Sequence, residues 1–543
     1  MPDTETKVAK PKIVLSKYTT ALLSSLQSVK KKIKPDDFSK IIVSQTVSFF
    51  ALVYERIRNA VEYREDHLIR RAAIERIIKR RLMLHPEGIG EAENLLRELL
   101  WARYFPNGGL GGHDIQTIQK IIDNYLSIKK QVTAGRLSQE VYFLTDFVID
   151  MLTCEIEETL SPEDTSSVTS LTYYIYQVLR KKVKIEGLTE EQRDAYFLTA
   201  LERAYRRSDR SYQRYHLFAM FYQPIGQQNP EQLKTLSTTL PKIFKKVDEM
   251  VKSLYVDKLT LFIKKQLPPF LILFSLLKIK NKISKAQTIL SDKNLLWNEV
   301  DLICREKYQQ LNQRVRNLAI RSFIYIFLTK MLFALILEFP ASRFFYNEVN
   351  TTSIIINTLF PPILMLTIVS IFRMPNEENT KKIYQRIIGI VDADATFETT
   401  IAFMPKKARE KKPLLVFGFT IFYSLTFIVT LFLIYQLLKY LQFNFISMII
   451  FVFFVSVITF FSYRIKQIVN EYRLEEKGSI FSPFVDFFFM PILSLGKFFS
   501  SEIAKLNFFI FIFDFLIEAP FKLVFEVVEE WISFVKKRKE EII

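Results

Sequence analysis

Residues 322–339 read SFIYIFLTKMLFALILEF, a stretch dominated by apolar side chains. Comparable apolar stretches cover 353–372, 414–438 and 443–463. A transmembrane helix needs about 20 predominantly apolar residues. The interior of a bilayer offers no water to backbone N–H and C=O groups, so each of these segments must be a helix. The sequence therefore predicts four membrane-spanning helices.

The composition extends this prediction to the whole chain. Among 543 residues there are only 13 glycines but 50 phenylalanines, and a glycine-poor chain makes few tight turns. We expect an all-α protein, with a cytoplasmic multi-helix domain followed by a polytopic membrane domain and amphipathic C-terminal helices. The predicted parts are a disordered tail (1–12), a cytoplasmic helical domain (13–283), a connecting helix (284–321), a four-span membrane domain (322–479) and interfacial amphipathic helices (480–543).

The basic residues between the spans predict the orientation. Loops rich in Lys and Arg alternate with loops that are poor in them: the segment before the first span and the loop 373–413 are basic, whereas 340–352 and 439–442 carry one basic residue each. Cytoplasmic loops carry the excess of Lys and Arg. We therefore expect a multi-pass protein of the cell membrane whose N-terminal domain, 373–413 loop and C-terminus are cytoplasmic.

The C-terminal segment 480–543 leaves two alternatives open. Polar residues such as Asp514, Glu518 and Lys522 recur near helical spacing within otherwise apolar sequence. A polar stripe of this kind favours helices that lie in the membrane interface. Two further spans would place the C-terminus on the same side, so loop charge does not separate four spans from six.

The net charge of +18 raises the question of an anionic partner. Arginines are dense in 56–81, and they alternate with aromatic residues in 203–222. A nucleic acid or a ribosome could bind such helices. However, 137–179 contains no Lys or Arg and many acidic residues. We favour ion pairs within the domain over a nucleic-acid interface.

A shorter apolar run, 267–277, lies between basic residues. It is too short to span a bilayer. Basic flanks around a short apolar run suit an interfacial segment that contacts anionic lipid, although a buried core helix is an equal alternative. The candidate lipid contacts are Lys264, Lys265, Lys278 and Lys280.

The sequence carries no recognisable catalytic or metal-binding motif. The four histidines lack a partner at metal-ligand spacing, and neither a nucleophile elbow nor a phosphate-binding loop is present. We therefore predict no enzyme activity and no cofactor. A membrane-tethered scaffold or adaptor that binds a protein partner is the favoured function, with a transporter or channel component and a nucleic-acid or ribosome binder as alternatives.

Lys330 is the residue that best supports the transport alternative. It lies in the middle of the first predicted span, where a charge costs about 2.5–3.5 kcal/mol, so it should face protein or water. The second span holds Pro361 and Pro362, which lack backbone N–H groups and therefore free the carbonyls of Asn357 and Thr358.

The two spans form an antiparallel pair in which Lys330 and the proline break lie at similar depth. We therefore expect the Lys330 ammonium, or a water that it binds, to satisfy the freed carbonyls with help from the Asn357 side chain. Two alternatives are that Lys330 snorkels to the surface or pairs with Glu338.

Overall fold

The computed structural model describes residues 13–28, 39–59, 65–185, 187–278, 285–346, 350–392, 413–474, 490–499 and seven single positions between 527 and 538. Throughout these residues the regular secondary structure is helical. The chain divides into two compact units. We call residues 16–264 the N-terminal unit and residues 265–397 and 408–515 the apolar-helix unit. The predicted tail 1–12 and most of 480–543 lie outside the described residues.

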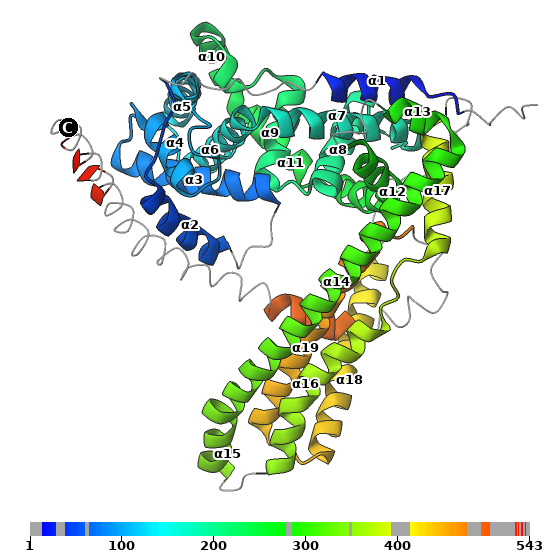
Figure 1. Cartoon of the computed structure of the whole chain (residues 1–543). Coiled ribbons are helices and arrows are strands. Elements are labelled where there is room, and N and C mark those ends of the chain that lie inside the picture. Colours follow the sequence, from blue (N-terminus) through cyan, green and yellow to red (C-terminus); the bar gives the residue numbers. More distant parts are fainter. Residues whose placement is uncertain are drawn as a thin grey trace, which may run out of the picture. The chain divides into compact units, whose positions relative to one another are not determined.

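The N-terminal unit is a packed array of helices (Figure 1). Its elements are α1 (Lys17–Gln27), α2 (Gln45–Asn59), α3 (Asp66–Leu84), α4 (Glu91–Trp101), α5 (Gly112–Thr133), α6 (Ser138–Leu160), α7 (Pro162–Leu179), η1 (Arg180–Lys182), α8 (Glu190–Leu201), η2 (Glu202–Arg206), α9 (Arg210–Phe221), η3 (Ile225–Gln227), α10 (Pro230–Ser237) and α11 (Leu240–Val251).

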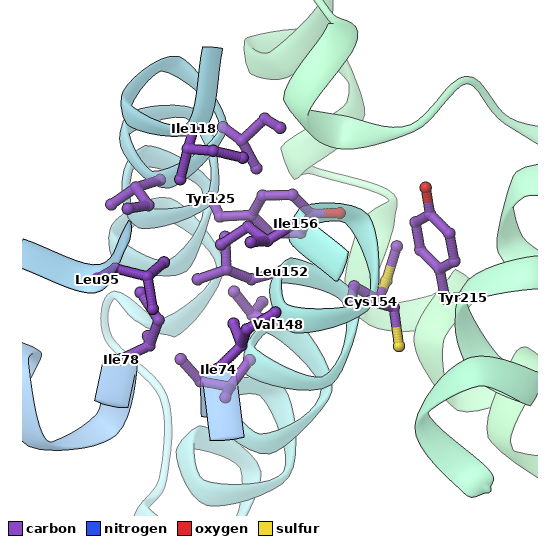
Figure 2. Close-up of a cluster of buried hydrophobic side chains, with 14 of the residues drawn as sticks. Ile74, Ile78, Leu95, Ile118, Tyr125, Val148, Leu152, Cys154, Ile156 and Tyr215 are labelled. Carbon is purple, nitrogen blue, oxygen red and sulfur yellow. The ribbon is translucent and has the colours of Figure 1, made fainter. Parts of the chain in front are cut away.

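Helix α6 lies at the centre of this unit. Val148, Leu152 and Ile156 recur every four residues on one side of α6 and pack against Ile and Leu side chains of α3, α4 and α5 (Figure 2). Cys154 lies on the other side of α6, toward Tyr215 of α9. Residues 148–157 of α6 are all buried, including the carboxylates of Asp150, Glu155 and Glu157. Burial of α6 on several sides therefore fixes the positions of the helices around it.

The apolar-helix unit contains the predicted spans, and its longer helices run alongside one another (Figure 1). Its elements are α13 (Ala286–Ser291), α14 (Lys293–Phe333), η4 (Ala334–Glu338), α15 (Phe339–Tyr346), α16 (Thr351–Ile371), α17 (Glu377–Val391), α18 (Pro413–Tyr440), α19 (Phe445–Val469), η5 (Asn470–Tyr472) and a short helix at Met490–Phe499.

Within the described residues, five helices are long and apolar enough to cross a membrane. Four of them overlap the predicted spans over most of their length. The first continues without a break from the predicted connecting segment, because α14, η4 and α15 form one helical run. The fifth is α12 (Leu254–Lys278), which includes the shorter apolar run 267–277. Its apolar window is 61% buried, against 6–33% for the other four. Such coverage by protein is typical of a core helix.

The loop predicted at 373–413 contains a helix. In α17, Ile383, Ile387 and Ile390 follow one face and are buried. Asn379 ties α17 to its neighbours, because its side-chain nitrogen donates to the Tyr308 hydroxyl (2.8 Å) and to the Tyr472 carbonyl (2.9 Å). An amphipathic stripe that finds an apolar surface forms a helix even between two spans.

The short helix Met490–Phe499 packs against α19 through a glycine. A Cβ atom at Gly496 would lie 2.1 Å from the backbone oxygen of Ser456 and 2.7 Å from the Cβ of Phe460. The Ser494 hydroxyl also lies 3.0 Å from the hydroxyl of Tyr423 in α18. The ten described residues of this helix are fewer than a bilayer-spanning helix needs, and Gly496 lets its backbone approach α19 closely.

We predict that Gly496→Ala loosens this helix from α19, because overpacking costs about 1–3 kcal/mol and should speed local hydrogen exchange by about fivefold or more. Exchange of the 490–499 peptide would be measured by mass spectrometry on the full chain in nanodiscs. Gly418→Ala is the matched control, because nothing lies within 4 Å of a Cβ at Gly418. Unchanged exchange in Gly496→Ala would show that the close approach is not rigid.

Candidate functional site

The apolar-helix unit buries a lysine and a glutamate against each other. The Lys330 Nζ lies 3.6 Å from Glu338 Oε2, and both side chains have 0% exposed surface. Glu338 is the partner that the sequence analysis gave as an alternative to the freed carbonyls of α16. A charge in such a place is stable only when an opposite charge faces it. The pair therefore explains how the first apolar helix tolerates both residues.

A local change of helix type brings the two residues together. Eight residues of α-helix turn by about 800°, which would leave Lys330 and Glu338 about 80° apart around the axis. The segment Ala334–Glu338 is instead a π-helix, in which the N–H of Phe339 bonds to the carbonyl of Ala334. The extra residue in this turn reduces the offset to about 20°. Both side chains therefore share one face.

Pro340 gives a physical reason for the π-helix. It has no N–H for the carbonyl of Ile336, and its ring would clash with that carbonyl in a regular α-helix. A wider turn just before the proline relieves this clash. The proline and the buried pair are thus linked through the same helical turn.

Two further helices contribute polar groups to this pair. Asn357 of α16 donates from Nδ2 to Glu338 Oε1 (2.7 Å) and to the backbone oxygen of Ser447 in α19 (3.2 Å). Phe454 of α19 places its ring 4.9 Å from Lys330 Nζ, within cation–π range. We call Lys330, Glu338, Asn357 and Ser447 the Lys330 cluster. Its members come from three separate helices, so it fixes how these helices meet.

Not all hydrogen-bonding groups of the Lys330 cluster find a partner among the described residues. Four buried atoms have no hydrogen-bond partner there: Lys330 Nζ, Glu338 Oε2, Asn357 Oδ1 and Ser447 Oγ. Each unsatisfied buried polar group costs about 1–3 kcal/mol. Such a concentration of unmet polar groups marks the cluster as the candidate functional site.

A second set of polar contacts joins the helix ends. Asn444 caps α19 by accepting from the Ser447 N–H (2.8 Å), and its Nδ2 donates to the Ser342 hydroxyl (2.6 Å). Asn350 caps α16, and its Nδ2 donates to Gln442 Oε1 (3.1 Å). Each cap thus also binds a residue outside its own helix. These contacts hold the ends of the antiparallel helices in register.

The structure modifies the predicted contacts of Lys330. Pro361 and Pro362 are buried within a continuous α16, and Thr358 is half-buried. Among the described residues Lys330 Nζ makes no direct hydrogen bond to a freed carbonyl. Asn357 joins the site through Glu338 instead. Ser447 and Phe454 were missed, because a lone serine or phenylalanine in an apolar span carries no distinguishing signal.

The candidate lipid contacts lie at the ends of the apolar part of α12. Lys264, Lys265 and Lys278 are exposed, and Lys280 lies outside the described residues. Exposed ammonium groups are compatible with anionic lipid, and the contact stays a prediction.

The arginine-rich helices of the N-terminal unit form ion pairs within the fold. Arg70 contacts Glu157 (2.7 Å) and Arg214 contacts both Asp150 and Asp248 (2.7 Å to the latter). The predicted pairing of the basic segment 56–81 with the acidic segment 137–179 is confirmed for Arg70, whereas the other paired arginines of 56–81 contact carboxylates elsewhere in the unit. Further arginines with carboxylate partners are Arg71, Arg76, Arg80, Arg81, Arg203, Arg206, Arg207 and Arg210.

His216 of α9 lies in the most strongly charged of these networks. Its Nε2 lies 2.8 Å from Glu158 Oε1 and its Nδ1 3.1 Å from Glu202 Oε2, and Arg206 also donates to Glu158. Burial alone would lower the pKa of His216, but Glu202 and Glu158 outweigh it and raise that pKa to about 9. The imidazolium is thus a structural cation at neutral pH and is not suited to act as a general base.

Within the described residues no group of His, Cys, Asp and Glu is arranged to hold a metal ion. No protein-family model matches the chain, and neither a curated protein nor a solved structure matches it significantly. Function must therefore be argued from the chain's own geometry.

For the buried pair we predict strong non-additivity. Lys330→Met should destabilise the chain by about 3 kcal/mol, because it leaves Glu338 buried without its counter-charge. Glu338→Met should cost a similar amount, whereas the double variant should cost much less, because apolar pairs of similar size replace buried ion pairs well. Thermal unfolding in nanodiscs would measure this cycle. Additive losses would mean that the two charges do not interact.

For His216 we predict a pH-dependent stability of the N-terminal unit. The folded-state pKa is raised from 6.5 to about 9, so the stabilisation is fully present below pH 6.5 and is lost as pH rises through 9. The loss should reach about 3 kcal/mol. His216→Gln should be less stable at pH 6.5 and nearly independent of pH over this range.

The readout is the urea concentration at which the buried thiol of Cys154 becomes reactive in the full chain, with modified peptides identified by mass spectrometry. Variant and wild type are compared at each pH, which cancels the pH dependence of the thiol itself. Equal pH dependence in both proteins would contradict the prediction.

Proposed function

We propose that the chain is a multi-pass membrane protein in which four helices cross the bilayer and the N-terminal unit serves as a cytoplasmic scaffold or adaptor. The spans are the apolar part of the run α14–η4–α15, then α16, α18 and α19. Their length and apolar composition support the crossing, and the alternating Lys and Arg content of the loops supports the orientation. In this proposal α12 stays in the protein core.

The observation that carries the scaffold role is a group of exposed apolar side chains that lie close together in the sequence of the N-terminal unit. Met83 and Leu84 at the end of α3 and Ile89 in the following turn are 65–82% exposed. We call these three residues the α3 patch. Clustered exposed apolar side chains mark protein interaction sites. The ion pairs of the unit point the same way, because arginines already paired inside the fold contribute less to a phosphate-binding surface.

A transporter or channel component is the second candidate. The specific observation in its favour is the Lys330 cluster, because ionisable residues inside a membrane bundle commonly mark ion or proton pathways. Ion or proton flux in proteoliposomes that is abolished in the double variant Lys330→Met with Glu338→Met, which we expect to remain folded, would support this candidate over the scaffold. A nucleic-acid binder is the weakest of the three candidates, because many arginines of the N-terminal unit already pair with carboxylates inside the fold.

We predict that a double substitution of the α3 patch, Leu84→Lys with Ile89→Lys, removes a specific protein partner from the full chain purified out of native membranes. The added charges make burial of the patch costly, while both sites are exposed in the free protein. Leu137→Lys is the matched control, because Leu137 is an 81% exposed leucine elsewhere in the same unit. Quantitative mass spectrometry, with and without nuclease, compares the recovered proteins.

The same partner set in the wild type, the double variant and the control would contradict a scaffold role for the α3 patch. Loss of partners on nuclease treatment alone would favour the nucleic-acid alternative.

A further inference from the structure

The Lys330 cluster combines donors and acceptors that no described group satisfies. Lys330 Nζ can only donate, Glu338 Oε2 and Asn357 Oδ1 can only accept, and Ser447 Oγ can do both. All four side chains are fully buried, with 0% exposed surface. One interior site therefore contains both hydrogen-bond donors and hydrogen-bond acceptors that lack a partner.

The ammonium of Lys330 and the carboxylate of Glu338 do not form a direct hydrogen bond with each other. At 3.6 Å, the separation between Lys330 Nζ and Glu338 Oε2 exceeds the range of a direct hydrogen bond. The other carboxylate oxygen already accepts from Asn357 Nδ2. Lys330 is also held toward the ring of Phe454. The geometry leaves an ammonium and a carboxylate oxygen facing each other with donor and acceptor capacity to spare.

The charge of the cluster restricts what can bind there. Lys330 and Glu338 together are neutral, so a bound sodium ion or chloride ion would leave a net charge in a low-dielectric interior, which is strongly unfavourable. A neutral ligand carries no such penalty. It must accept from an ammonium and donate to carboxylate or amide oxygens at the same time, and water meets both requirements.

We propose that the Lys330 cluster is a hydration site, in which water bridges Lys330 Nζ to Glu338 Oε2 and to the polar groups of Asn357 and Ser447. Water there satisfies the donors and acceptors of three helices without adding charge. The inference concerns the apolar-helix unit alone. It stands or falls independently of the scaffold role proposed for the N-terminal unit.

Radiolytic labelling tests this proposal directly, because X-rays generate hydroxyl radicals from water wherever it is bound, and these oxidise adjacent side chains. In the full chain in lipid nanodiscs, the Phe454 ring beside Lys330 should be oxidised although it is only 7% exposed. In Lys330→Met combined with Glu338→Met the oxidation of Phe454 should fall several-fold. Phe443, next to the Asn444 cap, is the internal reference and should be unchanged.

Ser447→Ala is the milder variant, and it should lower Phe454 oxidation even if the double variant does not fold. Absence of oxidation at Phe454 in the wild type, or oxidation equal to wild type in both variants, would overturn the proposal.

Ion substitution separates water from a bound cation. Thermal unfolding of the full chain should be the same in sodium, potassium and choline chloride at equal ionic strength, because a ligand specific to the folded state would raise the midpoint in the salt that supplies it. A sodium- or potassium-dependent rise that the double variant lacks would replace the hydration site with a cation site and overturn the proposal.

Discussion

The need to compensate charge and backbone polarity away from water is the constraint on which the proposed arrangement depends. A bilayer interior provides no hydrogen-bond partners, so the apolar segments must be helices and any ionisable residue among them must meet a counter-charge inside the protein. Lys330 and Glu338 meet this condition with each other. Because Asn357 and the backbone of Ser447 complete the contact, the same interaction that neutralises the charges also fixes how α14, α16 and α19 pack.

The two units solve the problem of buried charge differently. In the N-terminal unit Arg214 is almost fully buried but reaches three carboxylates, those of Asp146, Asp150 and Asp248, and His216 lies between Glu158 and Glu202. These charges are numerous and face opposite charges, which favours a structural role, although His67 Nε2, Arg71 Nε and Glu155 Oε1 also lack a hydrogen-bond partner among the described residues. The Lys330 cluster is smaller and has donors and acceptors left over among the described residues. The four atoms without partners in this cluster lie around a single ion pair in an otherwise apolar part of the unit, which is why we place the candidate site there.

Much of the helical architecture could be predicted from the sequence, because long apolar runs are a property of composition. Among the described residues, four of the five long apolar helices overlap the predicted spans. The details of the site were less accessible. Lys330 and Glu338 are eight residues apart and would diverge on an α-helix, and only the π-helix before Pro340 aligns them. Ser447 looks like an ordinary residue of the fourth span, since its importance arises from a tertiary contact. Helix α17 was predicted as part of a loop because its apolar face is short.

Chemical labelling of single cysteines in intact cells tests the central claim, four spans with the N-terminal unit in the cytoplasm, most directly. Tyr440 at the end of α18 is 84% exposed, and the Lys381 side chain in α17 is 61% exposed, whereas the native Cys154 and Cys304 are buried. The account predicts that an impermeant thiol reagent modifies Tyr440→Cys in intact cells and modifies Lys381→Cys only after permeabilisation. Labelling of Lys381→Cys from outside, with Tyr440→Cys protected, would contradict it.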